Sequence, residues 1–243
     1  MNTEHAALLA ELRQAARPTH LERHTTDSYG GSGHRFYFVS APAQRAIAKR
    51  WAAAHKEAAS PDVLAVIQSL FEGESHEEKT LAALMLGYHA KARRDARPAD
   101  LDRWLGHVNG WAEVDSLCQN VFAADQMIAD WPAWKALIEQ LSRDANINKR
   151  RAAMVLLNAP VNYSDDPRFA DLALSLIDRL KPERDILITK AVSWLLRSMV
   201  KRHRAAVERC LAEHGASLPA IAVRETRTKL ATGTKSGRSK AKA

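Results

Sequence analysis

The chain has 243 residues, of which 46% are apolar and 26% charged. This composition suffices for one substantial hydrophobic core and excludes a chain that is disordered throughout. The net charge of +8 and the pI near 9.7 indicate a polyanionic partner. Cys118 and Cys210 are too few for a disulfide framework or a zinc site, and we expect both to be buried thiols.

The N-terminal part of the sequence predicts separate helices. Apolar residues spaced over 8–12 predict a short amphipathic helix that ends before Pro18. Glycine, serine and threonine dominate residues 25–35, which we predict to form a loop. Pro42 and Pro61 then each open a further helix, because proline is favoured in the first helical turn.

The rest of the chain is repetitive. Helix pairs are predicted to begin near Ser75, Trp111, Ile147 and Arg184, at spacings of 36, 36 and 37 residues. The first helices share a texture of polar, then small, then large aliphatic residues, as in KTLAALMLG (79–87), RRAAMVLLN (150–158) and TKAVSWLLR (189–197). Such a period predicts an all-α fold, an α-solenoid of about six helix pairs whose equivalent faces line one concave surface. We expect a single domain over residues 1–230.

The last helix is predicted over about 218–230, followed by a basic, disordered tail at 231–243. From Arg224 onward the chain has seven basic residues and one acid, whereas residues 1–223 have 29 basic and 27 acidic residues. If the folded body binds nucleic acid, its cations must therefore gather on one face. The tail itself either aids solubility or acts as a phosphate-binding arm.

Motifs for metal or nucleotide chemistry are missing from the sequence. It contains no HExxH, no Cys/His cluster, no phosphate-binding glycine loop and no Gly-x-Ser-x-Gly elbow, so we expect no metal and no cofactor. The histidines are scattered, and we assign none a role. The N-terminal apolar run lacks the basic region of a signal peptide, and no stretch is long enough to span a membrane. These features favour a cytoplasmic protein.

Polar and aromatic residues recur at equivalent positions of the repeats. Trp111 and Asp115 lie one turn apart on the same face of a helix. Arg151 follows Asp115 by 36 residues, which is one repeat, and the solenoid should place it at the equivalent site. Taken singly, a tryptophan could equally be a core residue, the aspartate could favour a helix N-terminus, and the arginine could be solvated.

A third helix carries a matching stripe. Lys190, Trp194 and Arg197 are spaced i, i+4 and i+7, so they share one face. In a solenoid this face joins the concave surface that also holds the two preceding sets. An aromatic, a carboxylate and several cations would then converge without being close in sequence.

Three of these segments resemble the DNA alkylation repair proteins, the AlkD-type glycosylases with a HEAT-like fold: GWAEVDSLC (110–118), NKRRAAMVLL (148–157) and ITKAVSWLLR (188–197). HRFYFVSAPAQR (34–45) also looks like the aromatic-rich segment that leads into a proline-initiated helix in that family. The resemblance extends over roughly residues 20–230. It departs from many relatives at Gly110, where another aromatic can occur, and at Ala112 and Glu113.

The resemblance implies roles for individual residues. The catalytic carboxylate of the family corresponds to Asp115, and its sugar-facing tryptophans correspond to Trp111 and Trp194. Its backbone-contacting arginine corresponds to Arg151, and Lys190 with Arg197 are further candidates for phosphate contacts.

The implied activity is hydrolysis of the N-glycosidic bond of cationic alkylated purines, such as 3-methyladenine and 7-methylguanine, in base excision repair. The partner is then double-stranded DNA with alkylated bases, gripped by its backbone without flipping of the base. We expect a monomer, located in the cytoplasm at the nucleoid. The alternative is a non-catalytic α-solenoid that binds damaged DNA or a protein partner, because this fold hosts many binding functions.

Overall fold

The structure is a computed structural model that describes residues 2–17, 32–119 and 121–237. Within these residues the chain is helical, with an isolated bridge between Arg35 and Ser75. The all-α prediction is therefore confirmed for this part of the chain. The helices form two compact units, Met1–Phe122 and Ala123–Ala243. Of the predicted loop at 25–35, the portion before residue 32 lies outside the described residues.

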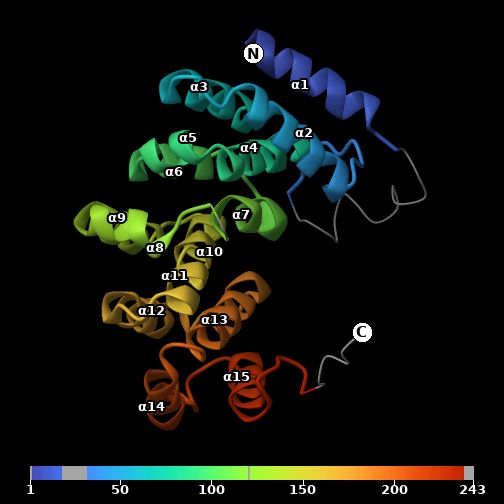
Figure 1. Cartoon of the computed structure of the whole chain (residues 1–243). Coiled ribbons are helices and arrows are strands. Elements are labelled where there is room, and N and C mark those ends of the chain that lie inside the picture. The colour runs from blue at the N-terminus through green and yellow to red at the C-terminus, as the bar shows by residue number, and fades with distance from the viewer. Residues whose placement is uncertain (1, 18–31, 120, 238–243) are drawn as a thin grey trace. The chain divides into compact units, whose positions relative to one another are not determined.

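In the first unit α4 is central. It packs against α2 and α7, with α3 and α5 also in contact with it (Figure 1). The helices of this unit are α1 (Thr3–Gln14), α2 (Ala41–Ala54), α3 (Ser60–Phe71), α4 (His76–Tyr88), α5 (Ala90–Asp95), α6 (Pro98–Leu105) and α7 (Gly110–Cys118).

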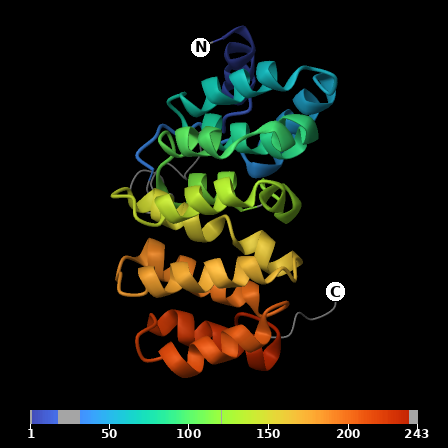
Figure 2. The same ribbon diagram turned by 90° about the vertical axis from the view of Figure 1, so that its left-hand side faces the viewer.

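In the second unit α13 is central. It contacts α10, α11, α12, α14 and α15, and Figure 2 shows these helices in successive rows. The helices of this unit are α8 (Ala124–Ala129), α9 (Trp131–Leu141), α10 (Ile147–Val155), α11 (Asn158–Tyr163), α12 (Pro167–Leu180), α13 (Ile186–Met199), α14 (Arg204–His214) and α15 (Ala220–Thr232). The helices α4, α7, α10 and α13 each begin within two residues of the predicted starts.

Local capping explains where several helices begin. Ser75 and Glu78 form a capping box at α4, in which the Glu78 amide donates to Ser75 Oγ at 3.2 Å and the Ser75 amide to Glu78 Oε2 at 2.8 Å. The Asp185 side chain accepts from the Leu187 amide at 2.8 Å at the start of α13. Such bonds satisfy amides that have no partner inside the helix.

Large side chains fill the core of each unit. Phe71 stacks on Trp104 in the first unit, with ring centroids 5.4 Å apart. Phe169 in the second unit meets Trp131 edge-on at 5.3 Å. Burial of a side chain of this size contributes roughly 1.5–3 kcal/mol. Both cysteines are buried, as expected.

The C-terminal segment is partly ordered. Helix α15 extends to Thr232 and ends at Gly233, which has a positive φ of 74°. Lys235 Nζ then lies 3.3 Å from Glu225 Oε1, so the first part of the predicted tail returns to α15. Residues 238–243 lie outside the described part of the chain. No helix in the described ranges is both long and apolar enough to cross a membrane.

Candidate functional site

Helix α7 presents Trp111 and Asp115 on one face. The face that points into the unit is buried through Val114 and Leu117. Trp111 is 37% exposed, and Asp115 one turn later is half-buried. Because this exposure is incompatible with a core position, Trp111 is not there to fill the interior.

The start of α7 depends on a glycine. Gly110 has a φ of +69°, in the left-handed region, and its amide donates to the Asn109 side chain at 3.0 Å. Any other residue there would be strained by roughly 1–2 kcal/mol.

A buried carboxylate anchors α7. Glu113 is 1% exposed and accepts hydrogen bonds from His34 Nδ1 at 3.0 Å, His76 Nδ1 at 3.0 Å and the Asn109 amide at 2.9 Å. Burial by itself would raise the pKa of Glu113, but the hydrogen bonds from His34, His76 and Asn109 outweigh it and lower the pKa to about 2. The charged side chain thus ties α7 to the first residue of α4 and to the segment before α2.

That segment, residues 32–39, is itself fixed to α4. The His76 amide donates to the Arg35 carbonyl at 2.8 Å, and the Tyr37 amide donates to Glu77 Oε2 at 3.0 Å. The Phe36 ring stacks on His76 with centroids 4.5 Å apart. The aromatic-rich segment therefore supports the histidine that holds Glu113. Sequence reasoning missed this network, and it had assigned no role to the histidines.

Arg151 is an internal residue of the second unit. It is 4% exposed, and its Nη1 donates to the Leu187 carbonyl in the first turn of α13 at 2.7 Å. The neighbouring Arg150 forms two hydrogen bonds to Glu183, of 2.8 and 3.0 Å. Arg151 is therefore not a solvated side chain, and it stabilises the start of the helix that carries Lys190 and Trp194.

The predicted stripe on α13 has an exposed and a more enclosed end. Lys190 is exposed, whereas Trp194 and Arg197 are half-buried. Arg197 Nε lies 3.3 Å from Glu225 Oε2 on α15. Burial lowers the pKa of Arg197 and the Glu225 carboxylate opposes that shift. Arg197 is thus held in an ion pair within the unit, while Lys190 faces solvent.

The predicted residues therefore form two sets. Trp111 and Asp115 belong to the first unit, and Arg151 belongs with the α13 stripe of the second. Each set lies on neighbouring turns or on contacting helices. That both sets meet one DNA duplex stays a prediction from the repeat spacing.

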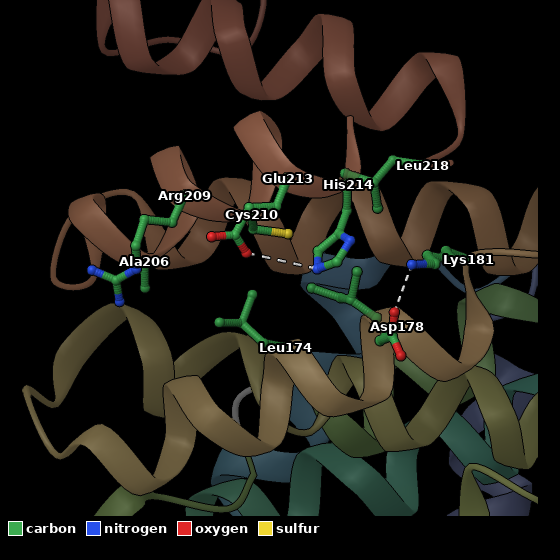
Figure 3. A pocket seen from close by; sticks show the side chains of 10 residues that line it. Leu174, Asp178, Lys181, Ala206, Arg209, Cys210, Glu213, His214 and Leu218 are labelled. Carbon is green, nitrogen blue, oxygen red and sulfur yellow. Dashed lines mark hydrogen bonds and ion pairs between the residues drawn. The ribbon is translucent and has the colours of Figure 1, made fainter. Parts of the chain in front are cut away.

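An apolar cavity in the second unit lies away from these residues. It has a volume of about 120 Å³ and opens between α12 and α14, lined in part by Leu174, Cys210 and His214 (Figure 3). At its rim Lys181 Nζ lies 2.6 Å from Asp178 Oδ1. Burial raises the pKa of the Cys210 thiol, which disfavours the reactive thiolate. None of the predicted site residues lines this cavity.

Comparisons with known proteins agree with the fold. The sequence pattern of a family described as "DNA alkylation repair enzyme" matches residues 8–230. A solved structure from Enterococcus faecalis, described as a predicted DNA alkylation repair enzyme, is similar with a TM-score of 0.66 and 17% identity. The match covers 95% of this chain and 96% of that one. No curated protein matches the sequence. The predicted α-solenoid is thereby confirmed.

Proposed function

The chain belongs to the DNA alkylation repair enzyme family, and from this premise we propose that it is a DNA glycosylase acting on cationic alkylated purines. The reaction is hydrolysis of the N-glycosidic bond in duplex DNA. The observation that carries the proposal is the pairing of an exposed Trp111 with Asp115 on one face of α7.

The chemistry of cationic alkylated purines matches the groups that the candidate site contains. Alkylation at N3 or N7 makes the purine cationic, so the base departs with the bonding electron pair as a neutral molecule and needs no protonation. The sugar then develops positive charge at C1′, and water adds there to leave an abasic site. An enzyme for this reaction needs stabilisation of positive charge and a positioned water.

Asp115 supplies a carboxylate where that charge develops. It can also orient the water and accept its proton as the new C–O bond forms. The ring face of Trp111 is electron-rich, and a deoxyribose cation placed against it is attracted. Trp194 would contribute a second ring from α13.

The phosphate contacts are assigned to the second unit. Lys190 is exposed on the same face of α13 as Trp194, so it is suited to bind the backbone near the lesion. Arg151 is buried and donates to the Leu187 carbonyl in the first turn of that helix. It is also the residue to which the resemblance assigns a backbone contact. A grip on the backbone permits the modified base to remain stacked, which differs from enzymes that flip the base.

Base release tests this proposal directly. The protein and its Asp115→Asn variant are incubated with duplex DNA that carries one 7-methylguanine, and free base is measured against the spontaneous rate. We expect release by the wild type and a loss of about a hundredfold or more in the variant, with DNA binding retained. Asp171→Asn, a change at an exposed carboxylate on α12, is the matched control and should leave release unchanged.

The alternative is a protein that binds damaged DNA without reaction. Tight, salt-sensitive binding without release from 7-methylguanine or 3-methyladenine DNA would favour that alternative and would make Asp115 a structural residue.

A further inference from the structure

A basic groove lies in the first unit, where α2 and α4 end and α5 begins. Its volume is about 560 Å³. Besides the ring of Tyr88, its wall carries four cations and one carboxylate: Lys49, Lys56, Lys91, Arg94 and Glu57. Helix α4, which forms part of the groove, also contacts α7, the helix that carries Trp111 and Asp115.

Positive charge is concentrated in this groove relative to the rest of the first unit. The first unit has 14 Lys or Arg residues and 15 Asp or Glu residues, so its formal net charge is −1. Four cations against one acid in a single groove therefore contrast with the rest of the unit. Gathering of cations on one face is what binding of a polyanion requires.

The groove cations are not neutralised by carboxylates of the described residues. Among the described residues, Lys49, Lys91 and Arg94 have no ion-pair partner. Asp95, which follows Arg94, instead accepts a hydrogen bond from Ser60 Oγ at 2.5 Å. Lys56 has only the distant Glu57, at 3.9 Å, and both side chains are more than 80% exposed.

The helix dipole favours Arg94, which lies in the last turn of α5, but it does not explain the placement of Lys91. Lys91 lies in the first turn of α5, where a cation meets the positive end of the helix and is disfavoured. Tyr88 is 39% exposed and has Lys49 Nζ 5.4 Å from its ring centroid, so it is not a core residue. An exposed ring beside unpaired cations is typical of a surface that contacts nucleic acid.

The surface beside Tyr88 is open for close approach. A side chain at Gly87 would meet nothing within 4 Å. A glycine inside a helix costs roughly 0.5–1 kcal/mol relative to alanine, and packing gives no reason for it here. Because Gly87 has no side chain, a ligand has room to approach the last turn of α4.

A buried histidine links the two walls of the groove. His89 is buried, and its Nδ1 accepts from the Ala92 amide at 3.1 Å. Its Nε2 must then carry the proton, and it donates to the His55 carbonyl at 3.0 Å. His89 thereby joins the end of α2 to the junction of α4 and α5, which are the two walls of the groove.

We propose that the basic groove binds the phosphodiester backbone of duplex DNA outside the lesion site. Lys49, Lys91 and Arg94 contact phosphates, and Tyr88 packs against the sugar of the same strand. Phosphate contacts of this kind carry sequence-independent affinity and position the protein on the duplex. The inference rests on the proposed function because it takes DNA as the polyanion.

The test compares charge reversals of equal size. The groove variant is Lys49→Glu with Lys91→Glu, and the control is Arg179→Glu with Arg209→Glu. The control residues are exposed on α12 and α14, outside the groove. Binding to an undamaged duplex is measured over a range of salt concentrations. We expect the groove variant to lose about tenfold or more in affinity and its log–log salt slope to shrink by roughly 2, against little change in the control.

The protein concentration that gives half-maximal release of 7-methylguanine is the second readout. We expect it to rise in the groove variant about as much as the affinity for the duplex falls, because the groove binds the substrate and holds no reacting group. Equal losses in both double variants, or an unaltered salt slope, would overturn the groove as a DNA contact. A selective loss of binding in a protein that releases no base would support the groove and refute the glycosylase instead. Lys49→Gln with Lys91→Gln replaces the groove variant if thermal melting shows that charge reversal unfolds the protein.

Discussion

Glu113 holds the helix of the candidate catalytic site, although it lies outside the reaction itself. It is two residues from both Trp111 and Asp115, and its three hydrogen-bond donors come from outside α7. Substitution by glutamine keeps the size but removes the charge that these donors stabilise. We expect Glu113→Gln to lower the free energy of unfolding by about 1–3 kcal/mol and base release by about tenfold. Urea unfolding and the release assay measure the two effects.

The matched control for this change is Glu74→Gln, at an exposed carboxylate before α4. It should leave both quantities unchanged. If Glu113→Gln behaves like this control, the buried network does not position α7.

Arg151 and Lys190 separate a structural from a binding role. Arg151→Ala removes the hydrogen bond to the Leu187 carbonyl together with the packing of a buried side chain, so we expect unfolding to become easier by about 1–3 kcal/mol. Lys190→Ala removes an exposed cation, so we expect weaker DNA binding at unchanged stability. Thermal unfolding and duplex binding of both variants provide the comparison. Weaker binding by Arg151→Ala with full stability would instead assign that residue to a phosphate.

Single residues also mark the limit of sequence reasoning. The pairing of Trp111 with Asp115 was predictable because both lie on one short helix. The contacts of Glu113 with His34 and His76 join residues 79 and 37 positions apart, and no local pattern marks them. Helical spacing likewise did not show that Arg151 points into the unit, because two adjacent arginines have equal polarity.

At the scale of elements, α1 is attached to α4 through a second buried carboxylate. His5 Nε2 lies 2.7 Å from Glu78 Oε1, and His5 Nδ1 lies 2.8 Å from Ser69 Oγ. Burial alone would raise the pKa of Glu78, but hydrogen bonds from His5 and Ser75 lower it to about 2. The contact therefore needs an ionised carboxylate in the folded protein.

This predicts acid sensitivity of the first unit. A glutamate in the unfolded chain has a pKa of about 4.3, so between about pH 4.5 and pH 2 the unfolded chain binds protons that the folded unit does not. The stabilisation is complete above this window and is lost as the pH falls through it. We expect unfolding to become easier by up to about 2 kcal/mol per carboxylate between pH 5 and pH 3. Glu78→Gln should reduce this dependence in urea unfolding, whereas Glu72→Gln, at an exposed carboxylate, should not. A pH dependence identical in all three proteins would contradict the assignment.

The helix starts were the most predictable part of the fold. Ser75 and the prolines at 42 and 61 act within their own first turns, so their effect is readable from neighbouring residues. The start of α7 needed more than sequence, because a positive φ at Gly110 cannot be told from ordinary flexibility in advance. The basic groove could not be predicted from the sequence either, because its cations come from two segments about 40 residues apart.

Across the whole molecule, the repeat reappears in the side-chain contacts. Thr80 Oγ1 donates to Gln44 at a separation of 36 residues, Ser60 to Asp95 at 35, and Arg151 to Leu187 at 36. Within each unit, these bonds join a repeat to the next one along the chain, as in quasi-one-dimensional architectures. The period in the sequence predicts this architecture, but it does not say which polar residue of a repeat meets its neighbour.

The basic C-terminus can be removed to test whether it contributes to DNA binding. Lys235 is paired with Glu225, so removal of residues 238–243 takes away Arg238, Lys240 and Lys242 without disturbing a described contact. If these cations only add non-specific phosphate contacts, the truncated chain binds undamaged duplex more weakly, with a salt slope smaller by up to about 0.9 per lost contact. Binding that stays salt-dependent after truncation would place the remaining contacts on the folded body, and release of 7-methylguanine at saturating protein should equal that of the full chain. Loss of all salt dependence on truncation would instead locate DNA binding in the tail and remove the physical basis of both the α13 and the basic-groove contacts.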